Sequence, residues 1–143
     1  MSGGRPRGDR GSVTIVGLGC CLALLLLGGI VIDLWRVLGA RRELAAVAEA
    51  SALGGADGID PDHLRATGEV ILDPTIAELM ARRVVAEQAT ALALKGPPRV
   101  SVDDHEVTVW LVSSVELGVI RIVLGPGEIE VEVESSARPR AAD

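Results

Sequence analysis

The sequence predicts an α+β protein in which a long N-terminal transmembrane helix continues into a small domain with one further amphipathic helix and a three- to four-stranded antiparallel sheet. Three patterns carry this prediction. Residues 13–32 form an unbroken apolar run, apolar residues recur at helical spacing between residues 73 and 96, and they alternate with polar residues from residue 99 onward. The chain has 143 residues, so about one small domain remains outside the apolar run.

The apolar run at residues 13–32 predicts a membrane anchor. It holds 20 residues without a charge, and a helix needs about 20 such residues to cross roughly 30 Å of hydrocarbon. A cleavable export signal has an apolar core of about 7–15 residues with a small-x-small site close behind it. This run is longer, and the "LGA" that follows has Leu38 where a small residue is required. An uncleaved anchor is therefore favoured, with a removed signal peptide as the alternative.

The residues after the run predict a membrane boundary. Trp35 and Arg36 stand where an interfacial aromatic ring and a snorkelling cation are expected. Basic residues flank the run equally, with Arg5, Arg7 and Arg10 before it and Arg36, Arg41 and Arg42 after it. Charge counting therefore does not orient the helix.

Small residues inside the run permit close helix packing in the membrane, with ordinary span composition as the alternative. They are Gly17, Gly19, Gly28 and Gly29, although they lack the GxxxG spacing. The two cysteines, Cys20 and Cys21, are adjacent in the same run, where a mutual disulfide or a metal site of standard geometry is unfavourable. A lipid anchor on either is disfavoured because the Leu-rich run continues beyond them, so we expect both to pack in the membrane.

The stretch at residues 33–57 predicts that the membrane helix continues into water. No proline occurs from Asp33 to Ala56, and "RRELAAVAEASALGGA" is rich in alanine. Apolar residues recur there at helical spacing, at Leu44, Val47, Ala48 and Ala52. The two parts predict one helix of about 44 residues. Gly54, Gly55 and Gly58 are expected to end it.

Two more helices are predicted beyond this point. Asp60 before Pro61 predicts a capped turn reaching about Arg65, and the aspartates around it are interpreted as caps and turns rather than a calcium site. A longer amphipathic helix opens with Asp73 and Pro74 and closes with Lys95 and Gly96. Its predicted apolar face comprises Ile76, Leu79, Met80, Val84, Ala91 and Leu94.

The remaining chain alternates with the period of a strand. Val100 and Val102, then Val107, Val109 and Leu111, predict a hairpin around "DDHE". "EIEVEVES" predicts a half-buried strand, with Ile129, Val131 and Val133 on one face and Glu128, Glu130, Glu132 and Glu134 on the other. We interpret these glutamates as a solvated face that discourages edge pairing, with cation or basic-partner binding as the alternative. Residues 115–124 fit either a strand or a short helix.

Composition and motifs argue against nucleic-acid binding and catalysis. After residue 32, acids outnumber bases by 19 to 11, and Trp35 and Trp110 are the only aromatic residues, so basic and stacking surfaces are lacking. His63 and His105 have no metal-ligand spacing, and no nucleophile elbow or phosphate loop occurs. An enzyme would have to use Asp103, Asp104, His105 and Glu106 in one pocket. We expect no catalytic, cofactor-binding or metal-binding residue, and therefore no enzyme.

Residues 11–56 resemble the N-terminal region of TadE-like and TadG-like proteins of the tight-adherence (Flp) pilus assembly system. The resemblance lies in the order of "RGSVTIV", the apolar run, "DLWR" and "ARRELAAVAEASALGGA". It covers about a third of the chain. The rest, a helix followed by strands ending in "VEVESSA", is similar in outline to shorter family members and is pilin-like in that sense.

The resemblance implies a non-enzymatic, membrane-anchored pseudopilin-like or accessory subunit of Flp/Tad-type pilus assembly or secretion in the bacterial inner membrane. The expected order is a basic cytoplasmic tail at 1–12, a transmembrane helix at 13–32, its Ala-rich continuation at 33–57 and an extracytoplasmic α+β domain at 58–143. Its partners would be membrane lipid, other pilus-assembly or secretion proteins, and itself through the N-terminal helix. The alternative is an exported soluble envelope domain that binds a ligand or modulates an envelope enzyme after signal removal.

A candidate processing site lies between Gly11 and Ser12. TadE-type members resemble prepilins, with a glycine before the cleavage point and a glutamate five residues on. Gly11 matches the first feature, but the fifth residue after it is Val16. A buried glutamate in a pilin rod requires a partner group in a neighbouring subunit. With valine in its place, the chain lacks one contact that would align neighbouring subunits in a filament. This favours an accessory role over that of a major filament subunit.

Overall fold

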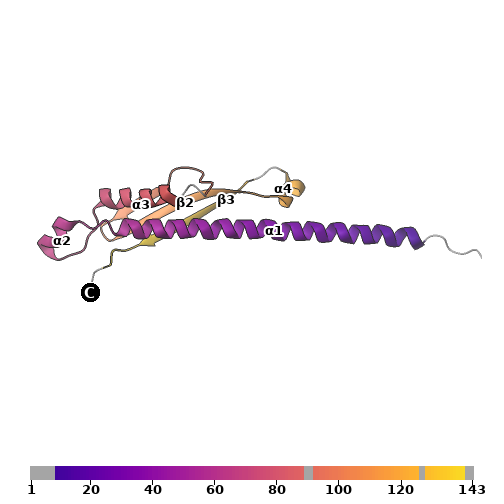
Figure 1. The fold of residues 1–143 in the computed structure, drawn as a ribbon, viewed down its shortest axis with the longest axis horizontal. Helices are drawn as coiled ribbons and strands as arrows, with labels where there is room; N and C mark the ends of the chain where they lie inside the picture. The colour runs from indigo at the N-terminus through magenta and orange to yellow at the C-terminus, as the bar shows by residue number, and fades with distance from the viewer. Residues whose placement is uncertain (1–8, 89–91, 126–127, 141–143) are drawn as a thin grey trace, which may run out of the picture. The chain divides into compact units, whose positions relative to one another are not determined.

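A computed structural model describes residues 9–88, 92–125 and 128–140 (Figure 1). It confirms the α+β fold class, with a long apolar N-terminal helix, further helices and a three-stranded antiparallel sheet. The chain divides into two compact units. The first comprises Met1–Trp35 with Leu117–Gly127, and the second comprises Arg36–Glu116 with Glu128–Asp143.

Helix α1 spans Asp9–Ala56. It begins inside the stretch predicted as the basic tail and runs without a break through the predicted membrane boundary, as expected from the absence of proline. Gly54 and Gly55 lie within the helix rather than ending it. Close packing requires a glycine at position 55, because a Cβ there would lie 2.9 Å from the Val107 side chain and 3.2 Å from the Ala81 Cβ. The helix ends at Ala56, two residues before Gly58.

Helix α2 spans Pro61–Thr67 and confirms the predicted cap. The Asp60 carboxylate accepts hydrogen bonds from the backbone N–H groups of His63, at 3.0 Å, and Asp62, at 2.9 Å. These bonds, that from His63 most of all, lower the pKa of Asp60 from its ordinary 3.8 because they stabilise the ionised form. Gly68 ends the helix with a φ of 78°, a left-handed conformation that favours glycine.

Helix α3 spans Pro74–Gln88 and corrects two predictions. The Asp73 cap is confirmed, since its carboxylate accepts from the backbone N–H groups of Thr75 and Ile76 at 2.9 and 3.1 Å. The predicted apolar face is wrong at Ile76, Leu79 and Met80, which are 40%, 68% and 40% exposed. Val84 is half-buried, and Leu94 packs against the core from outside the helix. The buried residues are instead Ala77, Ala81 and Val85.

Close backbone packing explains which face of α3 is buried. A Cβ at Gly58 would lie 2.7 Å from the Cα of Ala77, so only small side chains fit where these segments meet. Ala77 and Ala81 are fully buried there. The larger apolar side chains of α3 would not fit in this close contact between backbones. The face of α3 that turns inward is therefore the one whose small side chains can pack against α1 and the sheet.

The predicted end of this helix at Lys95 is also wrong. Ala91 lies outside the described residues, but residues 92–95 are not helical. The carbonyl of Ala93 accepts from the Ser113 hydroxyl at 3.0 Å, and the Lys95 N–H donates to the Val112 carbonyl at 2.9 Å. Leu94 forms an isolated bridge with Ser113. Backbone pairing with a strand distant in sequence therefore replaces the last turns of the predicted helix.

The sheet has the order β1-β2-β3, with both pairs antiparallel. Strand β1 spans Arg99–Asp103, β2 spans Glu106–Glu116 and β3 spans Glu128–Ala137. The pairing of Asp103 with Glu106 confirms the predicted hairpin. The open assignment of residues 115–124 is resolved, because β2 ends at Glu116 and Val119–Leu124 form helix α4.

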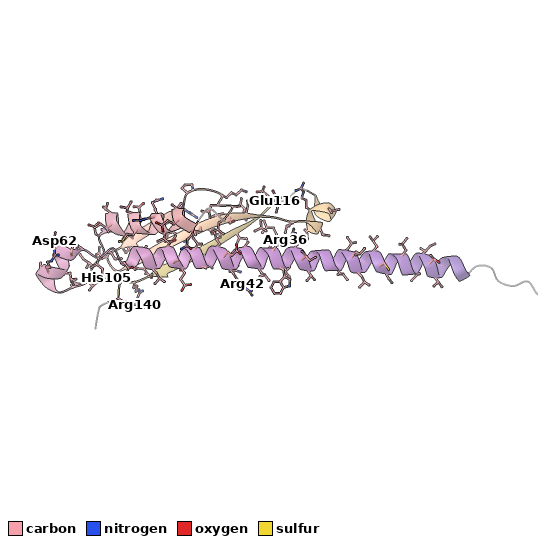
Figure 2. All side chains as sticks on the ribbon, viewed as in Figure 1. Arg36, Arg42, Asp62, His105, Glu116 and Arg140 are labelled. Carbon is pink, nitrogen blue, oxygen red and sulfur yellow. The ribbon has the colours of Figure 1, made fainter. Side chains whose placement is uncertain are left out.

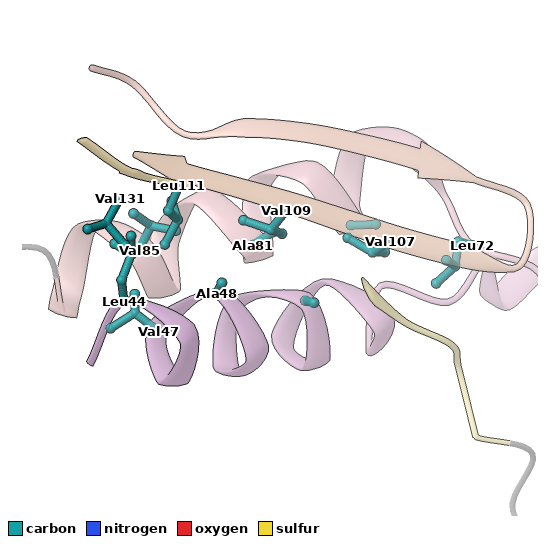
Figure 3. Packing of buried hydrophobic residues seen from close by; sticks show 12 residues of the cluster. Leu44, Val47, Ala48, Leu72, Ala81, Val85, Val107, Val109, Leu111 and Val131 are labelled. Carbon is teal, nitrogen blue, oxygen red and sulfur yellow. The ribbon is translucent and has the colours of Figure 1, made fainter. Parts of the chain in front are cut away.

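The core of the second unit lies between the sheet, α3 and the later turns of α1 (Figure 3). Leu44, Ala48 and Ala52 from α1 are fully buried in it. Val107, Val109 and Leu111 from β2 join them, confirming the strand alternation. The Ala-rich continuation of α1 is therefore a core element of the second unit.

Candidate functional site

The N-terminal part of α1 presents its apolar side chains outward (Figure 2). Between Val13 and Ile32 the large apolar side chains are from 39% exposed, at Leu26, to 74% exposed, at Ile15. Among the described residues, one helix is long and apolar enough to cross a membrane, by length and composition. A surface of this extent is rare on a soluble monomer. Trp35, at 64% exposed, and Arg36 follow it on α1.

The four predicted packing glycines have different surroundings. A Cβ built at Gly17, Gly19 or Gly28 meets nothing within 4 Å, so these positions are open. Gly29 is buried, and a Cβ there would overlap the Val119 side chain, lying 2.8 Å from its Cβ. Three of the glycines thus leave room for another molecule, whereas Gly29 receives helix α4 of the same chain.

Asp33 holds the start of α4. Its Oδ1 accepts from the Gly118 N–H at 2.9 Å, and its Oδ2 accepts from the N–H groups of Val119 and Ile120 at 2.7 and 2.9 Å. The first N–H groups of a helix have no partner within the helix. The carboxylate satisfies three of them and, as an anion, suits the positive end of the helix dipole. Asp33 itself is 1% exposed.

Sequence reasoning did not identify this role for Asp33. The visible signal was an acid, Asp33, directly after an apolar run. Its partners lie 85 to 87 residues further along the chain, in the segment whose structure the sequence left open. No local pattern links the two.

The residues named for a hypothetical enzyme do line one hollow. Asp103, Asp104, His105 and Glu106 border a space of about 690 Å³, together with Val70, Arg138 and Pro139. Among the lining residues, Arg138 Nε lies 3.7 Å from Glu106 Oε1, and His105 Nε2 lies 3.7 Å from Oε1 of Glu69, which does not line the hollow. Over the described ranges, no group of three or more His, Cys, Asp or Glu side chains is placed to hold a metal ion.

The glutamates of β3 contact basic residues of the same chain. Lys95 Nζ lies 2.7 Å from Glu130 Oε1 and 3.3 Å from Glu128 Oε2, and Arg99 lies 2.8 Å from Glu132. The hydrogen bond to Glu130, followed by that to Glu128, raises the pKa of Lys95 above 10.5. This face is an exposed array of ion pairs, in keeping with a solvated sheet surface.

The structure defines the class of the chain: one long apolar helix of membrane-spanning length whose later turns build the core of a small α+β unit. Residues 11–58 match the family model described as "Tad: Putative Flp pilus-assembly TadE/G-like". The match confirms the resemblance over that segment and supports involvement in Flp pilus assembly alongside other pilus-assembly proteins. No curated protein and no solved structure shows significant similarity to the chain.

Proposed function

We propose that this protein is a single-pass, membrane-anchored accessory subunit of Tad-type pilus assembly, pseudopilin-like in outline and non-enzymatic. Its N-terminus lies in the cytoplasm, residues 13–32 cross the inner membrane, and residues 58–143 lie on the extracytoplasmic side. The observation that carries the proposal is that the TadE/G-like segment, residues 11–58, coincides with the outward apolar surface of α1 and its continuation.

The continuity of α1 supports an anchor that stays attached. The helix that exposes Ile15 and Leu25 also supplies Leu44 and Ala48 to the core of the second unit. Removal of a signal of about 40 residues would delete Asp33 and leave the backbone N–H groups of Gly118, Val119 and Ile120 without their carboxylate. Retention of the whole helix keeps the contacts of Asp33 with α4 and the attachment of the apolar run to the core of the second unit.

Val16 supports an accessory role. It is 61% exposed on α1, at the position where TadE-type members carry glutamate. A valine makes no charged contact with a neighbouring subunit, so polymerisation would lack that electrostatic register. Gly17, Gly19 and Gly28 remain open for close approach of a partner helix, including a second copy.

The size and extraction behaviour of the mature protein test this proposal. In cells, we expect the protein to remain in the membrane fraction after carbonate washing and to be released by detergent, with an intact mass near the 14.8 kDa of the full chain or lower by the 11 residues up to Gly11. Loss of about 40 residues and release as a soluble protein would refute it and favour the exported soluble domain.

Alanine variants test the non-enzymatic part. Asp103→Ala and His105→Ala remove two polar side chains from the hollow, and we expect them to leave pilus assembly unchanged. Loss of assembly by both variants at unchanged protein level would contradict the proposal. A variant of the anchor, Leu25→Asp, should weaken membrane retention and assembly together and serves as the comparison.

A further inference from the structure

Helix α4 is a short apolar segment attached to the last turns of the apolar run. It spans Val119–Leu124 (Figure 1). It belongs to the same compact unit as α1 up to Trp35. Val119 packs on Gly29, and Asp33 caps the helix one turn further along. Because the apolar run ends at Ile32, these contacts place the start of α4 at the depth of its final turn.

Helix α4 exposes Ile122 and Arg121 and contains no acid. Ile122 is 81% exposed, the highest value among the large apolar side chains of the described residues. Residues 117–127 contain one charged residue, the exposed cation Arg121, in a chain whose formal net charge is −6. An apolar surface with one cation at its rim suits the boundary between acyl chains and anionic headgroups.

Backbone groups at both ends of α4 have hydrogen-bond partners. Asp33 accepts from the N–H groups of Gly118, Val119 and Ile120, and the Gly125 N–H donates to the Arg121 carbonyl at 3.0 Å. A helix this short has few internal hydrogen bonds and depends on such contacts. In lipid, where water cannot supply the missing partners, this satisfaction is required.

We propose that α4 is a second lipid-contacting element, which inserts Ile122 at the membrane boundary beside the end of the α1 span and is positioned there by Asp33. The inference rests on the proposed membrane anchoring of α1. The occupant of this surface is lipid because α4 packs through Val119 on Gly29, inside the apolar run whose side chains are exposed, so Ile122 lies beside the surface that the bilayer would cover. The small domain would then be tethered to the bilayer at two points.

The test places a fluorescent probe at single cysteines in the full chain. Cys20 and Cys21 are replaced by alanine, and a polarity-sensitive fluorophore is attached at Ile122→Cys, at Leu25→Cys in the span, or at Leu79→Cys on α3. Leu79 is the matched control because it is also apolar and is 68% exposed. Each protein is reconstituted in phosphatidylcholine–phosphatidylglycerol vesicles and quenched with aqueous iodide or with doxyl-labelled lipid.

We expect the Ile122 probe to behave like the Leu25 probe, with quenching by doxyl lipid and iodide quenching several-fold weaker than at Leu79. An Ile122 probe that matches Leu79, while Leu25 remains lipid-quenched, would overturn the inference and leave the anchor intact. Iodide access at Leu25 would overturn the anchor and the inference together. Shielding of Ile122 that occurs in native membranes but not in pure lipid vesicles would indicate a protein partner and would overturn the assignment to lipid.

An Asp33→Ala variant tests the positioning role. In the Ile122→Cys background, it should raise iodide quenching of the probe several-fold, and Asp33→Asn, which keeps one acceptor oxygen, should have a smaller effect. The Leu25 probe should not change, which shows that the anchor stays in the bilayer. Unchanged quenching at Ile122 in Asp33→Ala would overturn the role of Asp33.

Discussion

Leu44 provides a direct test of whether the continuation of α1 builds the core of the second unit. Its side chain is 0% exposed and lies in the same cluster as Val85, Leu111 and Val131 (Figure 3). Leu44→Ala removes buried apolar atoms and leaves a cavity, which costs about 2–5 kcal/mol at sites of this kind. With a urea m-value of about 2 kcal/mol/M, a loss of about 3 kcal/mol lowers the unfolding midpoint by about 1.5 M.

The assay is urea unfolding of the full chain in detergent micelles, followed by fluorescence. Trp35→Phe leaves Trp110 on β2 as the single tryptophan, so the signal reports the second unit. The matched control is Leu53→Ala on the same helix, where the side chain is 48% exposed and the expected change is within about 0.5 kcal/mol. Equal midpoints for Leu44→Ala and Leu53→Ala would refute the reasoning and would indicate that this part of α1 does not pack against the sheet.

Three further outcomes follow from the structure. Gly29→Ala should displace α4 and speed tryptic cleavage at Arg121 in micelles, whereas Gly28→Ala, where a Cβ meets nothing within 4 Å, should not; equal cleavage rates would contradict the contact. Because the folded-state pKa of Asp60 is lowered from 3.8, its cap stabilises the fold above that pH and loses its effect as pH falls through the lower folded value. The difference in urea midpoint between wild type and Asp60→Ala should therefore shrink below pH 3.8, and a difference that grows in acid would argue against the cap. Because the folded-state pKa of Lys95 is raised above 10.5, its ion pairs stabilise the fold below that pH and lose their effect as pH rises through the folded value. The midpoint difference between wild type and Lys95→Gln should fade in that alkaline range, and a constant difference would mean that packing rather than charge is responsible.

Local signals in the sequence were sufficient for several elements. The absence of proline and the Ala-rich composition predicted that α1 passes the membrane boundary, and Asp60 and Asp73 marked the starts of α2 and α3. The alternation of valine and polar residues predicted the hairpin and β3. These features depend on interactions between residues close in sequence, so their patterns are readable without the fold.

Contacts between distant residues decided the rest. The last predicted turns of α3 are replaced by pairing of Ala93 and Lys95 with β2. The buried face of α3 follows Ala77 and Ala81 because glycines near the end of α1 allow close approach only to small side chains. Helical periodicity alone favoured the larger apolar residues, since a pattern reports which residues are apolar and not which neighbour they will meet.

The sequence by itself determined the apolar helix, its continuation, the α+β order and the resemblance to TadE/G-like proteins. Each of these rests on composition or on spacing along the chain. The tertiary structure alone brought Asp33 to the N–H groups of Gly118, Val119 and Ile120 and thereby joined residues 117–125 to the end of the apolar run. The physical reason is that the sequence around Asp33 shows only a carboxylate at the edge of an apolar run. The N–H groups that it binds lie more than 80 residues away and reach its oxygens only when the chain folds.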